Sequence, residues 1–158
     1  MRITRLMTTK VESCRPDESL SQAAERMWTH DCGCLPVLDP DGTGRVIGMV
    51  TDRDICMSAM FQGRPLHDLC VADAMSKDVR TCRPTDSVHV AERIMQESQI
   101  RRLPVVDDDG CLIGLLTLAD LAREAAREQS SPKKDLTGDE IGMTLASISV
   151  PAKRHPAA

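Results

Sequence analysis

The chain has 158 residues, of which 41% are apolar and 28% charged, as in proteins that bury a hydrophobic core. It carries one Trp, one Phe, no Tyr and a net charge of -4, so it lacks the aromatic platforms and the positive charge with which proteins bind nucleic acids. No stretch reaches about 18 consecutive apolar residues and the N-terminus has no apolar signal core, so we expect a cytoplasmic protein without a membrane-spanning helix.

The first half of the chain predicts one β-α-β-β-α unit. A short extended run and a Pro precede a helix whose apolar residues recur at helical spacing. Two short apolar runs then flank an Asp/Gly-rich turn, which indicates a β-hairpin, and a second helix follows. The predicted elements are an extended run at 11–14, a helix that starts near Ser19, strands at 35–38 and 46–50 around a turn at 39–44, and a helix that begins at Thr51.

The second half repeats this unit. Residues 14–16, Cys-Arg-Pro, return as residues 82–84, and the motif Gly-h-h-Thr-x-x-Asp, where h is apolar, ends at Asp54 in one copy and at Asp120 in the other. Such ordered matches indicate an internal duplication. The predicted elements of the second copy are an extended run at 79–82, a helix that starts near Ser87, strands at 103–106 and 112–116 around a turn at 107–110, and a helix that begins at Thr117.

One such unit cannot bury both faces of so small a sheet, whereas two units packed together can. We therefore expect an α+β fold of tandem β-α-β-β-α repeats, packed sheet to sheet with pseudo-two-fold symmetry. In the C-terminal tail, residues 139–148 predict one more short helix with Ile141, Leu145 and Ile148 on one side. The predicted organisation is a first repeat at 3–63, a linker at 64–72, a second repeat at 73–128 and a tail at 129–158.

These motifs resemble those of the CBS-domain pair, also called the Bateman module, over about residues 3–128. A pair without an attached enzyme or channel is similar to the small bacterial stress-response members of that family. The resemblance implies a regulatory module rather than an enzyme. It also implies an adenosyl ligand such as AMP, ADP or ATP in the clefts between the repeats, and association as a disc-like homodimer.

The Thr-x-x-Asp motifs are the first candidate ligand contacts, at Thr51 and Asp54 and at Thr117 and Asp120. In the family, the Asp accepts hydrogen bonds from ribose hydroxyls and the Thr contacts ribose or phosphate. A carboxylate can accept both protons of a diol, and a helix N-terminus can offer N–H groups to a phosphate. The alternative needs no ligand, because Thr-x-x-Asp is also a capping box that closes a helix N-terminus.

Basic residues before the second-copy strand are further candidates. In family members that bind nucleotides, residues at the position of Arg101 and Arg102 often reach the phosphates, which suits the forked donors of arginine. The first copy has Gly33 and Cys34 there, so only Arg53 could supply charge on that side. The alternative is that these arginines are solvated surface residues.

Thr81 is the last candidate, because the family uses the backbone and small side chains of the extended run to hold the adenine edge. Ser13 is its counterpart in the first copy. The alternative is that both are ordinary strand residues. None of these candidates requires a cofactor.

The seven cysteines predict free thiols that pack as small hydrophobic side chains, because their number is odd and no export signal precedes them. His30, Cys32 and Cys34 could join a soft-metal site or form a redox pair, but the second copy has no counterpart and the set gives too few ligands for tetrahedral zinc. We therefore predict no metal site. Neither a G-x-S-x-G nucleophile motif nor a P-loop occurs, so we predict no catalytic residues.

Three functions remain in competition. The first is an adenosyl-ligand sensor that shifts between two packings when the ligand binds. The second is a ligand-free module that dimerises and docks on an unknown partner protein, with the Thr-x-x-Asp motifs acting only as caps. The third is a thiol or metal sensor built on Cys32 and Cys34.

Overall fold

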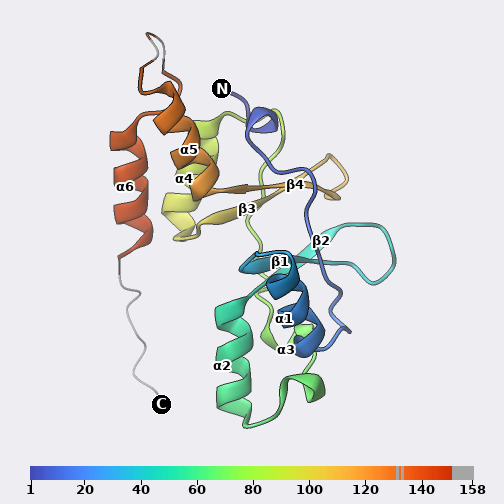
Figure 1. The fold of residues 1–158 in the computed structure, drawn as a ribbon. Coiled ribbons are helices and arrows are strands. Elements are labelled where there is room, and N and C mark those ends of the chain that lie inside the picture. Colours follow the sequence, from blue (N-terminus) through green and yellow to red (C-terminus); the bar gives the residue numbers. More distant parts are fainter. Residues whose placement is uncertain (131, 133, 151–158) are drawn as a thin grey trace. The chain divides into compact units, whose positions relative to one another are not determined.

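The computed structural model describes residues 1–130, 132 and 134–150, and Figure 1 shows the path of the chain. Two two-stranded sheets are flanked by helices, which confirms the predicted α+β tandem repeat. The last eight residues of the predicted tail, 151–158, lie outside the described residues, as do 131 and 133. In chain order the elements are η1 (Ile3–Arg5), α1 (Leu20–Thr29), β1 (Cys34–Leu38), β2 (Val46–Thr51), α2 (Asp52–Gln62), η2 (Leu66–Asp68), α3 (Val71–Ala74), α4 (Val88–Ser98), β3 (Arg102–Val106), β4 (Leu112–Thr117), α5 (Leu118–Glu128) and α6 (Gly138–Ile148).

The first helix of each repeat begins where its serine cap predicts. The Ser19 hydroxyl accepts the Gln22 N–H at 3.2 Å, and the Ser87 hydroxyl accepts the Val90 N–H at 3.4 Å. These bonds satisfy amides that have no partner within the helix. The apolar stripes of α1 and α4 then face inward, and their buried members include Leu20, Ala23 and Met27 in α1 and Val88, Ala91 and Met95 in α4.

The extended runs predicted at 11–14 and 79–82 are not strands, which corrects the β-α-β-β-α pattern at its first element. Only Cys14 pairs, through a parallel bridge to Val37, and Cys82 is likewise the one bridged residue of its run. The ladder stops because Pro16 has no N–H with which to extend it.

The β1–β2 hairpin is antiparallel and pairs Val37 with Gly48. A side chain at position 48 has no room, because a Cβ there would lie 2.7 Å from the sulfur of Met75 and 3.2 Å from the Ser76 carbonyl oxygen. The backbone of Met49 forms two hydrogen bonds with Ser76, at 2.8 and 3.0 Å, which brings the two segments into this close approach. The Gly of the repeated motif therefore serves the packing of the hairpin.

The described chain divides into two compact units. One contains residues 8–81 and 104–114, and the other contains residues 1–7, 82–103 and the chain from 115 onward. The first seven residues thus belong with the second repeat: the buried Ile3 donates its N–H to the Asp86 carbonyl oxygen at 3.0 Å.

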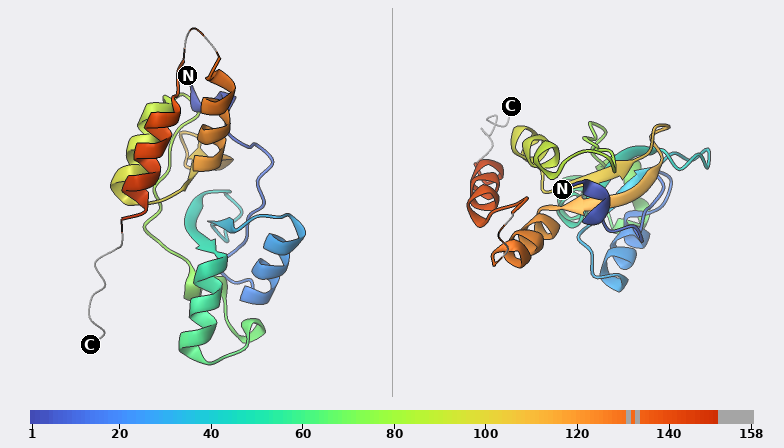
Figure 2. Two further views of the ribbon diagram at one scale, coloured as in Figure 1. Left: turned by 60° about the vertical axis from the view of Figure 1, so that its left-hand side comes forward. Right: turned by 90° about the horizontal axis from the view of Figure 1, so that it is seen from above.

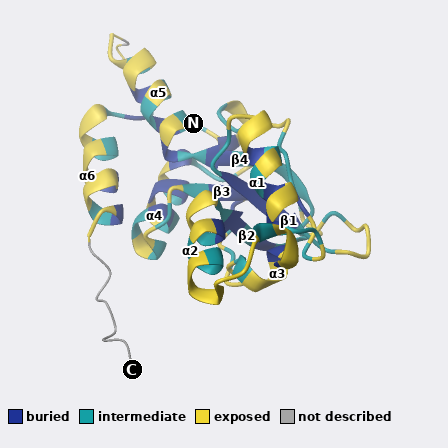
Figure 3. Ribbon diagram, turned by 60° about the horizontal axis from the view of Figure 1, so that its bottom comes forward, coloured by how far each residue is buried: buried dark blue, intermediate teal, exposed yellow. Residues whose placement is uncertain are grey.

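The segment predicted as a linker, residues 64–72, is part of the hydrophobic core of the first repeat. Leu69 and Val71 are fully buried in the same cluster as Leu20 and Leu35. The Leu20 N–H also donates to the Leu69 carbonyl oxygen at 2.8 Å, so this segment packs on the start of α1. Figure 3 shows the general pattern, with buried strands in dark blue and exposed helix surfaces in yellow.

The tail forms α6, which packs against α4 and α5 (Figure 2). The apolar side predicted for this helix is partly wrong: Ile148 is buried as expected, but Leu145 is 47% exposed and the polar Thr144 is fully buried. Thr144 can be buried because its hydroxyl has hydrogen-bond partners on α4. The apolar pattern therefore predicts the wrong buried residue in this turn, Leu145 in place of Thr144.

Candidate functional site

Thr51 and Asp54 form a complete capping box at the start of α2. The Asp54 carboxylate oxygen Oδ2 accepts the Thr51 N–H at 2.9 Å and the Thr51 hydroxyl at 2.7 Å, and the Thr51 hydroxyl oxygen accepts the Asp54 N–H at 3.2 Å. The other N–H groups of this turn also have acceptors, since Asp52 N–H reaches the Gly33 carbonyl oxygen at 3.4 Å and Arg53 N–H reaches Asp52 Oδ1 at 2.7 Å. The first turn of α2 therefore holds no spare N–H for a phosphate.

Thr117 and Asp120 repeat this box at the start of α5. Asp120 Oδ2 accepts the Thr117 N–H at 2.8 Å and the Thr117 hydroxyl at 2.6 Å. Its other oxygen, Oδ1, forms an ion pair with Arg123, whose side chain is 63% exposed. Ala119 is an exposed residue, and its N–H has no protein acceptor in the described part of the chain. The two motifs thus form the same kind of helix cap, but only the first turn of α5 has an N–H group without a protein acceptor in the described part of the chain.

The Asp54 carboxylate differs from that of Asp120 in its second oxygen. Within residues 1–130, 132 and 134–150, Oδ1 of Asp54 has no hydrogen-bond partner, whereas Oδ1 of Asp120 is engaged by Arg123. Asp54 is a half-buried residue, and the side chain of Asp120 is only 9% exposed. Each can accept a donor from a small molecule, in the second repeat by displacing a solvent-exposed arginine.

Arg101 lies next to the second capping box. Its carbonyl oxygen accepts the Leu118 N–H at 2.9 Å, in the same way that the Gly33 carbonyl oxygen accepts the Asp52 N–H. The structure thus places Arg101 and Gly33 at equivalent positions of the two repeats. Arg101 is exposed and Arg102, the first residue of β3, is half-buried. Two arginines thus lie next to the N-terminus of α5, whereas the equivalent residues of the first repeat, Gly33 and Cys34, carry no charge.

The remaining candidate ligand contacts are Arg53 and Thr81. Arg53 is exposed on the first turn of α2, one residue before Asp54. Thr81 is half-buried directly before Cys82 and belongs to the unit that contains the first repeat, so its role as an adenine contact stays a prediction.

The buried cysteines Cys14 and Cys82 are packing residues. Burial, with the negative charge of Glu18, raises the pKa of the Cys14 thiol to about 12, and burial with Asp86 does the same for Cys82. Cys32 and Cys34 are not joined by a disulfide. His30 lies 3.6 Å from Glu12, and no group of three or more His, Cys, Asp or Glu side chains among the described residues could hold a metal ion.

A groove that no sequence motif predicts lies between α1 and α2. Its volume is about 350 Å³, and it lies beside Trp28, whose side chain is 88% exposed. The one sequence feature that points to this surface is the position of the two aromatic residues, because both Trp28 and Phe61 lie in the first repeat. In the structure both are exposed on its helices. The other groove-lining residues are Ala24, Met27, Asp31, Cys32, Gly33, Asp52 and Ile55.

None of the helices in the described part of the chain has the length and apolar character that crossing a membrane requires.

Comparison with known proteins identifies the repeat. The family model for the CBS domain matches twice, at residues 3–60 and 71–127. The CBS domain-containing protein YhcV of Bacillus subtilis is 36% identical over 125 residues, which cover 79% of this chain and 86% of that protein. The CBS domain protein PAE2072 from Pyrobaculum aerophilum, solved in complex with AMP, is 27% identical with a TM-score of 0.72, over 80% of this chain and 94% of that one.

A second similar structure, Hypoxic Response Protein I with two coordinated zinc ions, is 30% identical with a TM-score of 0.70, over 78% of this chain and 98% of that one. The two family matches coincide with the two copies of the Gly-h-h-Thr-x-x-Asp motif and with the two helix-hairpin-helix units of the structure. The chain therefore belongs to the CBS-domain family and carries the domain as a pair.

Proposed function

We propose that this CBS-domain pair is a regulatory sensor that binds an adenosyl ligand such as AMP, ADP or ATP at its Thr-x-x-Asp motifs and responds by a change of conformation. The observation that carries the proposal is the pair of carboxylates, Asp54 and Asp120, each fixed in the first turn of a helix by a threonine. A fixed carboxylate is a good acceptor for the two hydroxyls of a ribose. The AMP complex of the similar protein PAE2072 supports this choice of ligand class.

The second motif is the better candidate for a phosphorylated ligand. Arg101 and Arg102 bring two positive charges to the N-terminus of α5. The N–H of the exposed Ala119 there has no protein acceptor among the described residues. Helix N-termini with available N–H groups and nearby arginines favour phosphate. The first motif has Gly33 and Cys34 in place of the arginines, so it would bind a phosphorylated ligand more weakly.

A thermal-shift screen tests the proposal against AMP, ADP, ATP and adenosine. A ligand at a hundred times its Kd stabilises the folded state by about 2.7 kcal/mol, which is a measurable rise in Tm. We expect the nucleotides to stabilise the protein more than adenosine does, because adenosine has no phosphate for the arginines. The substitution Arg101→Ala should remove that advantage, and Arg93→Ala, which changes an exposed arginine of α4, should not.

A specific observation also favours the second candidate, a module that acts by binding protein. Both capping boxes are complete without any ligand, and Trp28 and Phe61 are 88% and 77% exposed on the helices of the first repeat. Exposed aromatic side chains beside an apolar groove are typical of interaction surfaces. We propose that this surface takes part in homodimer formation or in docking a partner protein.

Sedimentation velocity tests this second proposal. If α1 and α2 form the interface, Trp28→Glu should lower the sedimentation coefficient of the full chain to that of a monomer, and Met143→Glu, at another exposed apolar residue, should not. A wild-type chain that sediments as a monomer at high concentration would contradict the homodimer.

A further inference from the structure

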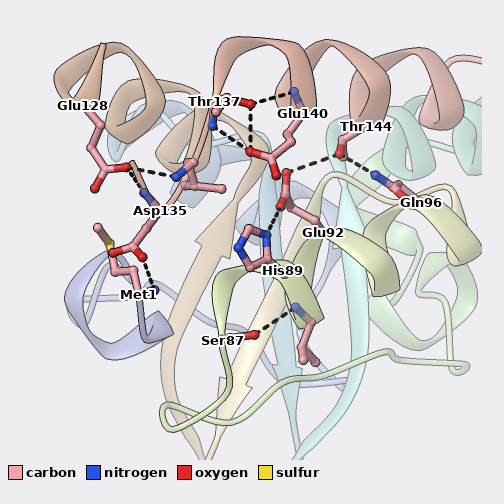
Figure 4. Close-up of polar contacts among 12 residues, drawn as sticks. Met1, Ser87, His89, Glu92, Gln96, Glu128, Asp135, Thr137, Glu140 and Thr144 are labelled. Carbon is pink, nitrogen blue, oxygen red and sulfur yellow. Dashed lines mark hydrogen bonds and ion pairs between the residues drawn. The ribbon is translucent and has the colours of Figure 1, made fainter. Parts of the chain in front are cut away.

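Helix α6 is attached to α4 by a buried polar contact. The side-chain amide of Gln96 donates to the Thr144 hydroxyl oxygen at 2.6 Å, and the Thr144 hydroxyl donates to Glu92 Oε1 at 3.4 Å (Figure 4). Thr144 is fully buried, and Glu92 is only 5% exposed. Two side chains from α4 thus hold one hydroxyl from α6 out of contact with water.

Glu92 is an unusual residue for this position because a carboxylate loses its hydration when it is buried. Its other oxygen, Oε2, lies 3.2 Å from Nδ1 of His89, one turn earlier on the same helix. The carboxylate of Glu140 on α6 also acts on it, with the same sign of charge. Burial raises the pKa of Glu92 and the nearby Glu140 raises it further, while the contacts with His89 and Thr144 oppose this rise.

The segment that precedes α6 is held by contacts that do not involve Glu92. The Glu128 carboxylate at the end of α5 accepts the N–H groups of Asp135 and Leu136, at 2.7 and 2.9 Å, and Leu136 is fully buried. The chain thus stays anchored to α5 immediately before α6 begins. Loosening the contact between α4 and α6 would release the helix without detaching the tail.

We propose that α6 is a pH-responsive clasp over the face formed by α4 and α5, held closed when Glu92 is protonated and loosened when Glu92 is ionised. In the closed state an ionised Glu92 would be both desolvated and close to Glu140. In the open state water solvates it. Between the ordinary carboxyl pKa and the raised pKa of Glu92, the open state therefore binds fewer protons than the closed state. Raising the pH in this range favours opening.

Proton linkage gives the direction in which pH shifts the closing equilibrium of α6. Burial raises the pKa of Glu92 above its ordinary value in the closed structure. In the open state of the proposal the carboxyl is solvated and has its ordinary pKa, so closure is fully favoured below the ordinary carboxyl range and is lost as the pH rises through the raised value. One linked proton changes the closing equilibrium by at most tenfold per pH unit. Release would uncover small apolar residues of α5 that line its contact with α6, namely the half-buried Ala122 and the buried Ala125.

Amide hydrogen exchange of the full chain between pH 4.5 and 8 tests the clasp, after correction for the pH dependence of intrinsic exchange. We expect the protection of α6 to fall as the pH rises, by up to tenfold per pH unit. In Glu92→Gln the protection of α6 should stay at its low-pH level throughout. Glu97→Gln, at an exposed glutamate of the same helix, should keep the wild-type fall. His89→Gln should keep a fall of the same size but move it to higher pH, because His89 opposes the rise in the pKa of Glu92.

Constant α6 protection in the wild type, or an undiminished fall in Glu92→Gln, would overturn the proposal. A fall that disappears in His89→Gln would overturn it too, because it would assign the titration to the imidazole. If Glu92→Gln does not fold, the carboxyl carbon of Glu92 can be titrated directly by NMR in the wild-type chain. We expect its midpoint above the ordinary carboxyl range, and Ile148→Asp, which disrupts the buried end of α6, should return it to that range; a wild-type midpoint in the ordinary range would contradict the clasp.

Discussion

Replacing Asp120 with Ala removes the acceptor that closes the capping box of α5. The carboxylate oxygen Oδ2 serves both the N–H and the hydroxyl of Thr117, at 2.8 and 2.6 Å, so both donors lose their partner. Loss of a helix N-terminal cap costs about 0.5–2 kcal/mol. The ion pair with Arg123 adds about 0–1 kcal/mol, because that side chain is 63% exposed and its interaction is screened by water. We therefore expect the free energy of unfolding to fall by about 1–2 kcal/mol.

Urea unfolding followed by circular dichroism measures this change, and Asp54→Ala provides the internal comparison. The first box has the same three bonds without an arginine partner, so its loss should cost about as much as a cap alone, near 1 kcal/mol. Glu97→Ala, at an exposed residue of α4, is the control and should change stability by less than about 0.5 kcal/mol. A loss above about 4 kcal/mol in either aspartate variant, or no loss in both, would refute the assignment of these residues as caps.

Three further predictions follow from packing and burial. Gly48→Ala should lower the free energy of unfolding by about 1–3 kcal/mol, because the added methyl has a sulfur atom 2.7 Å away; an unchanged urea midpoint would contradict the close approach. Leu69→Ala should cost about 2–5 kcal/mol in the same assay, as for a core residue, whereas a value near zero would show that residues 64–72 act only as a tether. Iodoacetamide at pH 8 should label the exposed Cys56 but not Cys14 or Cys82, because their pKa values of about 12 leave almost no thiolate. Mass spectrometry of the digested protein measures the labelling, and a label on Cys14 or Cys82 would contradict their burial.

Local chemistry explains which elements could be predicted from the sequence. Ser19, Thr51 and Thr117 each stand at a helix start with a polar partner three residues later, and a capping box is a short-range interaction. The first hairpin has glycines at 42 and 44 with φ of +76° and +80°, values that favour glycine. These features depend on residues close in sequence, so the pattern alone places them.

Long-range packing explains the rest. Nothing near Leu69 in the sequence shows that it joins the core of the first repeat, because its partners lie some fifty residues earlier on α1. The same holds for Ile3, which pairs with residues of the second repeat, and for Thr144, a polar residue buried because α4 supplies its hydrogen-bond partners. In the candidate site, the duplicated motif identifies Asp54 and Asp120, but the engagement of Asp120 by Arg123 is visible only in the folded chain.

Isothermal titration calorimetry of AMP into the full chain is the most direct test of the central proposal. We predict saturable binding in which Asp120→Ala abolishes the tighter site and Arg101→Ala weakens it, while Arg93→Ala leaves binding unchanged. The capping cost of about 1–2 kcal/mol leaves Asp120→Ala folded, and circular dichroism before each titration verifies this. Absence of heat with AMP, ADP and ATP at millimolar concentration, or AMP binding that is the same in Asp120→Ala as in the wild type, would contradict it.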